Sequence, residues 1–255
     1  MIGPMDDNEI YRAVLTTLFV CAPAAFAVLL IVPAPYGRYR RREGGLPARS
    51  AWFWMELPAV LVPIIFGLYA SRPWNYSFVL LAFWEAHYIY RTFFYTHLLR
   101  GGPARRFPAS LTLLAIVFNV LNGYANGYHL FRSGVDYNSS WFIGARFLLG
   151  SLLFLVGLMI HIGSDRRLRK LRETGIEAYS IPRGGLFEYV SAPNYFGEIV
   201  QWCGWAIASW SLPGLAFALF TMANLLPRGI SHHRWYVNTY DGYPSKRKAV
   251  IPFLL

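Results

Sequence analysis

The sequence is poor in charged residues, which make up only 15% of the chain, whereas a soluble domain usually carries about a quarter. Acidic residues are the scarcer kind, with 13 Asp and Glu against 24 Lys and Arg. A nucleic-acid-binding domain with such a basic excess would be soluble and rich in charge. Because more than half of the residues are apolar and 18% are aromatic, we expect an integral membrane protein without a nucleic-acid partner.

Cysteine is also scarce, and the two cysteines, Cys21 and Cys203, both lie inside apolar runs. A disulfide framework is therefore not expected, and no spacing typical of a metal site is present, so no metal is predicted. The chain has no G-x-G-x-x-G motif, which argues against a Rossmann-type nucleotide site. Internal repeats, low-complexity tracts and long linkers are absent from the sequence, and we expect one domain over residues 1–255.

Long apolar runs predict an all-α fold with seven transmembrane helices. The acidic N-terminus lacks a basic region, so the first run is expected to be a retained helix and not a cleaved signal. The predicted spans are 11–32, 51–70, 76–99, 108–131, 141–163, 194–210 and 213–236.

The basic residues are distributed unevenly between the two sides of these spans. The segments after spans one, three and five, together with the C-terminal part after residue 236, hold 17 of the 24 Lys and Arg residues. The positive-inside rule then places the N-terminus outside and the C-terminus in the cytoplasm. These residues either set the topology and contact anionic headgroups, or some of them hold a phosphorylated ligand on the cytoplasmic face.

Polar side chains interrupt several spans. Glu56, in the second span, is either an interfacial carboxylate paired with Arg49 or a carboxyl group facing a cavity, where desolvation would favour its protonated form. In the third span, Tyr88, Arg91 and Tyr95 share one helix face. Tyrosines near membrane ends are often only interfacial anchors, but Arg91 in the same stripe favours an inward, polar face.

The C-terminal spans repeat this pattern. His161 and Asp165 are four residues apart, as are Asn194 and Glu198, and each pair is either a structural contact or part of a site. The last span has a polar residue at every fourth position: Asn224, Arg228, His232 and Tyr236. Together these stripes suit a pocket that takes an apolar ligand from the bilayer and a charged one from the cytoplasm. A lipid transporter would also line a cavity with polar groups, although no matching halves are evident.

Several separated motifs, found in the same order, resemble the steroid 5α-reductase family. They are WFWMELP, HYIYRTFFY, GSDRRLRKLR, GGLFEYVSAPNYFGEIVQW, RGISHHRWY and DGYPSKRKAVIPFLL. The similarity runs from about Trp52 to the C-terminus and is densest after Ser164. Related membrane methyltransferases and sterol or enoyl reductases resemble the PNYFGE part too.

The resemblance implies a seven-helix membrane enzyme that uses NADPH to reduce the C4–C5 double bond of 3-oxo-Δ4-steroids, with hydride delivered to C5. Glu56 and Tyr88 match the family residues that bind the C3 carbonyl, and Trp52, Met55 and Trp202 match the substrate pocket. Cofactor-binding positions match Arg100, His161, Asp165, Arg172, Tyr179, Asn194, Glu198, Arg228, His232 and Tyr236. Most of the cofactor site is thus expected within about residues 160–255.

Some residues depart from the family pattern. Met55 stands where family members carry Gln, and His161 replaces an Asn. Ser180 and Gly102 stand where an Arg would be expected near the phosphates, although Arg105 and Arg106 are close by. The alternatives are a reductase of another conjugated lipid, such as a polyprenoid or enoyl thioester, a methyltransferase that uses S-adenosylmethionine, and a lipid transporter.

The expected partners are a steroid or other apolar enone from the bilayer, and membrane lipids. The chain is rich in Arg and Ala and has a short N-terminal segment, which is typical of a bacterial source. We therefore expect a bacterial inner membrane, with the cofactor site facing the cytoplasm.

Overall fold

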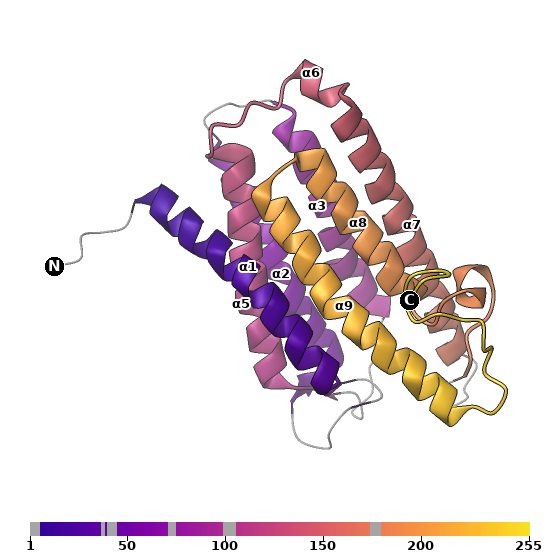
Figure 1. Ribbon diagram of the computed structural model, residues 1–255. Helices are drawn as coiled ribbons and strands as arrows, with labels where there is room; N and C mark the ends of the chain where they lie inside the picture. The colour runs from indigo at the N-terminus through magenta and orange to yellow at the C-terminus, as the bar shows by residue number, and fades with distance from the viewer. Residues whose placement is uncertain (1–5, 37–38, 40–44, 71–74, 99–105, 174–179) are drawn as a thin grey trace. The chain divides into compact units, whose positions relative to one another are not determined.

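The chain is mainly helical in the computed structural model, which describes residues 6–36, 39, 45–70, 75–98, 106–173 and 180–255 (Figure 1). The long helices are α1 (Asp7–Ile31), α2 (Ala48–Leu68), α3 (Ser77–Ile89), α5 (Ala109–Phe131), α7 (Ala145–Glu173), α8 (Pro193–Ser209) and α9 (Leu212–Thr239). Shorter elements are the π-helix η2 (Tyr90–Tyr95), α4 (Thr96–Leu98), α6 (Ser139–Phe142), the 3-10 helix η3 (Gly185–Glu188), and strands β1 (Leu46–Pro47) and β2 (Arg106–Phe107).

The predicted spans coincide with helical segments, the third of them formed by α3, η2 and α4 in succession. Within the described parts of the chain, four helices are long and apolar enough to cross a membrane: α1, α2, α5 and α7. The fifth span differs most from its helix, since it was expected to cover 141–163 whereas α7 covers Ala145–Glu173. Asn138 instead caps the separate helix α6 by accepting a hydrogen bond from the Trp141 amide at 3.1 Å, and α7 begins at Ala145.

Residue contacts divide the chain into two compact units. Unit one comprises residues 1–18, 35–147 and 211–213, and unit two comprises 19–34, 148–210 and 214–255. The expectation of a single domain stays a prediction. Most of the predicted cofactor residues belong to unit two, whereas Glu56 and Tyr88 belong to unit one.

In unit one, α2 is fixed by side chains that bond to its backbone. Pro63 has no amide hydrogen, so the carbonyl of Ala59 lacks its usual partner in the helix. The indole Nε1 of Trp84 on α3 donates to that carbonyl at 2.7 Å. Asn119 on α5 donates to the carbonyl of Met55 at 2.6 Å. In an apolar environment such bonds replace those that water would otherwise make. They fix the part of α2 that carries Glu56.

In unit two, α7 and α8 approach each other so closely that glycine is required at the contact, and Figure 1 shows the two helices side by side. A Cβ atom at Gly197 would lie 2.5 Å from the backbone nitrogen of His161 and 2.8 Å from the carbonyl oxygen of Gly157. Gly150, Gly157 and Gly204 are equally tight against the facing backbone. Small residues of this kind let membrane helices pack backbone to backbone.

The C-terminal segment of unit two pairs with the segment that precedes α8. The amides of Ser191 and Ala192 donate to the carbonyls of Lys248 and Ala249, at 2.8 and 3.1 Å, and the Lys248 amide donates to Tyr189. Val250 is fully buried in an apolar cluster with Ile199 on α8. The start of α8, which carries Asn194 and Glu198, is therefore fixed from both sides.

A stability test follows from the α7–α8 contact. We expect Gly197→Ala to lower the free energy of unfolding by about 1–3 kcal/mol, because the added methyl group meets backbone atoms that cannot move aside. Gly163→Ala on α7 is the matched control, since its Cβ meets nothing within 4 Å, and it should be neutral or stabilising by up to about 1 kcal/mol. Denaturant titration in detergent micelles measures both, and equal effects would contradict this account of the contact.

Candidate active site

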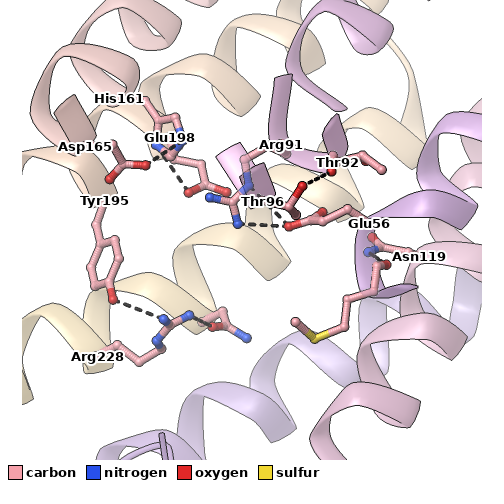
Figure 2. A network of polar contacts seen from close by, with 12 residues as sticks. Glu56, Arg91, Thr92, Thr96, Asn119, His161, Asp165, Tyr195, Glu198 and Arg228 are labelled. Atoms are coloured by element: carbon pink, nitrogen blue, oxygen red, sulfur yellow. Dashed lines mark hydrogen bonds and ion pairs between the residues drawn. The ribbon is translucent and has the colours of Figure 1, made fainter. Parts of the chain in front are cut away.

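A buried ion pair in unit one joins α2 to the π-helix η2. Arg91 Nη2 and Nε lie 2.9 and 3.2 Å from Glu56 Oε1, and both side chains are about nine-tenths buried (Figure 2). Two donors on one oxygen fix the direction of the guanidinium. The spacing of Arg91 to Tyr88 predicted an inward polar face, but the partnership with Glu56 was not predicted.

The π-helix places Arg91 among aromatic rings. Its guanidinium carbon lies 4.7 Å from the ring centroid of Trp52 and 4.9 Å from that of Tyr95. A cation over aromatic faces is stabilised by the ring quadrupoles, the more so where water is scarce. Single turns of π-helix often mark functional sites, and here the π-helix begins two residues after Tyr88.

The pairing bears on the charge of Glu56. A guanidinium at hydrogen-bond distance favours the ionised carboxylate, whereas the expected role as a hydrogen-bond donor needs the neutral acid. Tyr88 lies one turn before Arg91 on the same helical run, is only 3% exposed, and packs on Trp84 with 4.9 Å between ring centroids. Its hydroxyl can donate in its ordinary protonated form.

The two unit-one residues predicted for the substrate pocket lie on α2 close to this ion pair. Met55 is buried in an apolar cluster with Ala51 and Phe107, and the Trp52 ring packs against that cluster. The Trp52 ring also meets Tyr95 edge to face, with 5.9 Å between the ring centroids. An apolar wall next to a buried charge pair is the arrangement that an apolar ligand with one polar group would need.

In unit two, His161 is the centre of a polar cluster formed by α7 and α8. Its Nε2 lies 3.6 Å from Asp165 Oδ2 and its Nδ1 3.6 Å from Glu198 Oε2. Nδ1 also lies 3.3 Å from the backbone carbonyl of Asn194, whose side-chain amide donates to Asp165 at 3.2 Å. Figure 2 shows Asp165 and Glu198 on either side of the imidazole. Four residues that the sequence placed in the cofactor site are thus brought together.

A second group in unit two centres on Tyr195, a residue that the sequence analysis did not select. The Tyr195 hydroxyl accepts a hydrogen bond from Arg228 Nη2 at 3.0 Å and lies 3.1 Å from His232 Nε2. The other guanidinium nitrogen, Nη1, donates to Asn224 at 3.0 Å. The polar stripe predicted on the last span is therefore real over Asn224, Arg228 and His232. The signal for Tyr195 was its place beside Asn194 in the PNYFGE motif.

The remaining predicted residues of unit two lie in its core. Tyr236 is 3% exposed and stacks on Tyr243, with 5.4 Å between ring centroids and 9° between the ring planes. Trp202 is fully buried and packs on Phe217 at 4.3 Å between ring centroids. Both have a packing role in this structure, and their predicted contacts with cofactor and substrate stay predictions.

Three predicted cofactor residues lack a described side chain. Arg100 and Tyr179 lie outside the described residues, as does Gly102. Arg172 lies near the end of α7. Ser180, which stands where an arginine was expected, is partly buried.

A clamp between the loop before α8 and the C-terminal segment was also missed by the sequence analysis. Arg247, with a fully buried side chain, donates to the carbonyl of Pro182 at 3.0 Å and pairs with Glu188 at 3.3 Å. The other carboxylate oxygen of Glu188 accepts from the Gly184 amide at 2.5 Å. Gly184 and Gly185 have φ values of +85° and +58°, conformations that few other residues tolerate, which accounts for the two consecutive glycines that begin the GGLFEYV segment.

The clamp lowers the pKa of Glu188, first through the Gly184 amide bond and then through the charge of Arg247. The described residues contain no group of three or more His, Cys, Asp or Glu side chains arranged to hold a metal ion.

The chain is similar to one family along most of its length. A family model described as 3-oxo-5-alpha-steroid 4-dehydrogenase matches residues 105–255. The 3-oxo-5-alpha-steroid 4-dehydrogenase 1 of Mus musculus is 47% identical over 237 residues, covering 91% of each chain. The Bos taurus protein of the same name is 44% identical over 238 residues, covering 90% of this chain and 91% of its own. The 3-oxo-5-alpha-steroid 4-dehydrogenase 2 of Homo sapiens is 43% identical over 241 residues, covering 91% and 92%.

The Glu188 clamp makes a pH prediction. Because the folded-state pKa lies below the ordinary value of about 4.5, the clamp is fully formed above that pH and is lost as the pH falls through the lowered pKa. We expect the hydrogen-exchange protection of the Gly184 amide, corrected for intrinsic exchange, to fall over this range. Glu188→Gln should remove the pH dependence, and constant protection in the unmodified protein down to strongly acidic pH would contradict the assignment.

Proposed function

The chain belongs to the 3-oxo-5-alpha-steroid 4-dehydrogenase family, and we propose that it reduces the C4–C5 double bond of 3-oxo-Δ4-steroids to give 5α-dihydrosteroids. The observation that carries the proposal is 43–47% identity to enzymes of that name over about nine-tenths of both chains. The buried polar groups of α2 and η2, set beside apolar walls, support a ligand of this kind. Such extensive similarity favours the steroid reductase over a polyprenoid or enoyl-thioester reductase, a methyltransferase or a transporter.

We assign the substrate carbonyl to Glu56 and Tyr88. Hydride addition at C5 moves negative charge onto the C3 oxygen, and donors aimed at that oxygen stabilise the transition state more than the ground state. The Tyr88 hydroxyl is such a donor. Glu56 is a second one in its protonated form, which requires that its bond to Arg91 be released or shared when substrate binds. Arg91 then remains close enough to stabilise the developing charge.

A nicotinamide cofactor is implied by the oxidoreductase family, and we propose NADPH. When bound, NADPH supplies the hydride. The residues present fit such a group, because the amide of Asn194 and the carboxylates of Asp165 and Glu198 offer the donors and acceptors that a carboxamide needs. Arg228 offers positive charge and His232 a ring nitrogen for hydrogen bonding to phosphate, and Arg100, Arg172, Tyr179 and Tyr236 complete the proposed set.

The topology proposed for this activity has seven membrane spans. α3 with η2 and α4, α8, and α9 would cross the bilayer in addition to the four helices that qualify by length and composition. The basic loops would place the N-terminus outside and the cofactor site at the cytoplasmic face. A bacterial inner membrane stays a prediction based on composition, since the relatives compared above are mammalian.

The activity itself is tested with purified protein, NADPH, and testosterone or progesterone, with the product analysed by mass spectrometry. A gain of two hydrogens at C4–C5 is expected. Reduction of other enones alone would shift the proposal to another conjugated lipid, and binding of S-adenosylmethionine without NADPH would refute it.

The carbonyl assignment predicts large losses of turnover in two variants. Tyr88→Phe should lower kcat by roughly 10²-fold, the usual effect of removing one donor to a developing oxyanion. Glu56→Gln should also lower kcat, because it breaks the charge pair with Arg91. Tyr69→Phe, which alters an exposed tyrosine at the end of α2, is the control and should be silent. If both site variants kept near-normal turnover, the assignment would be wrong.

The cofactor assignment predicts a selective binding defect. Replacing Arg228 with Leu should raise the KM for NADPH by about 10-fold or more, since a charge-assisted hydrogen bond contributes about 1.5–3 kcal/mol. Arg234→Leu, at an exposed position on the same helix, provides the matched control and should leave KM unchanged. Equal KM values for the two variants would remove Arg228 from the proposed phosphate contacts.

A further inference from the structure

Glu85 on α3 is a buried carboxyl group that the proposed mechanism has not used. It is 8% exposed, and neither of its carboxylate oxygens has a hydrogen-bond partner among the residues that the structure describes. Leaving a buried polar group unsatisfied costs about 1–3 kcal/mol, and an isolated ionised carboxylate would cost far more. Glu85 is therefore held as a neutral acid, with an O–H group and a carbonyl oxygen both available to a partner.

The position of Glu85 connects it to the proposed carbonyl site. Glu85 and Tyr88 are three residues apart in the regular part of α3, so their side chains are neighbours on one helix face. Thr92, one turn beyond Tyr88, is fully buried, and its hydroxyl likewise has no hydrogen-bond partner in the described structure. The face that presents Tyr88 thus has unused hydrogen-bonding groups on both sides of it.

The reduction has a chemical need that such a group would meet. Hydride addition to C5 leaves an enolate, and one proton must reach C4 for each double bond reduced. If the Tyr88 hydroxyl alone gave this proton, it would become a tyrosinate in a water-poor interior, which is costly. A neutral acid on the same helix face can return the proton to Tyr88 at once.

We propose that Glu85 is the proton reservoir for Tyr88, an inference that rests on the proposed steroid reduction. As the C4–H bond forms, the Tyr88 O–H bond breaks. As the Tyr88 O–H bond re-forms, the Glu85 O–H bond breaks, directly or across one water molecule, and solvent water then returns a proton to the Glu85 carboxylate. Glu85 acts through Tyr88 and is a positioning and proton-supplying residue.

The decisive variant is Glu85→Gln, which keeps the shape, the neutrality and the hydrogen-bonding capacity but has no acidic proton. We expect kcat to fall roughly 10- to 100-fold, in line with general-acid contributions. Because protonation becomes rate-limiting, the isotope effect from NADPH deuterated at the transferred position should fall toward 1, while the solvent isotope effect in D₂O should rise. A purely structural defect would not exchange one isotope effect for the other. Glu85→Asp retains the acid and should recover part of kcat.

Ser151→Ala is the control, because it removes a buried hydroxyl in α7 of unit two that, like the Glu85 carboxyl, has no hydrogen-bond partner among the described residues. It should leave kcat and both isotope effects unchanged. The proposal is overturned if Glu85→Gln matches the unmodified enzyme, or if it is slow with both isotope effects unaltered. If that variant does not accumulate in membranes, Glu85→Asp decides, since an unchanged solvent isotope effect there also overturns it. Failure of the unmodified protein to reduce any 3-oxo-Δ4-steroid would instead refute the proposed function.

Discussion

Inside a membrane protein, polar groups must find their partners within the chain, because the hydrocarbon around them offers none. This constraint explains why the indole of Trp84 serves the carbonyl that Pro63 leaves without an amide. It also explains why Glu56 and Arg91 occur as a pair with aromatic rings around them. Where the described part of the chain offers no partner, as at Glu85, the same constraint indicates a group that a ligand or water must satisfy.

Each unit uses a different device to position polar groups. Unit one relies on side chains that bond across helices, above all the double contact of Arg91 with one oxygen of Glu56. Unit two relies on glycines, since Gly157 and Gly197 have no side chains and so let the backbones of α7 and α8 come into contact. The resulting short helix separation allows His161 to reach both Asp165 on its own helix and Glu198 on the next.

Much of this could be predicted from the sequence, for reasons that concern particular residues. The helices could be predicted because the apolar stretches are long. The stripe of Asn224, Arg228 and His232 could be predicted because a spacing of four places residues on one helix face. Contacts between residues distant in the sequence could not be predicted. Nothing local in Glu56 indicates Arg91, and nothing in Arg247 indicates Pro182, since such pairs depend on how helices pack. The partnership of Glu56 with Arg91 was missed for the same reason.

The pairing of residues 189–192 with 248–249 has a consequence for biosynthesis. The loop that leads into α8 is made well before the segment with which it pairs, with all of α8 and α9 between them. Until the later segment has emerged and folded back, the loop lacks the carbonyls of Lys248 and Ala249 and the buried guanidinium of Arg247. Synthesis of α8 and most of α9 can thus be complete while the segment that leads into α8 still lacks these contacts, so this part of the chain folds late.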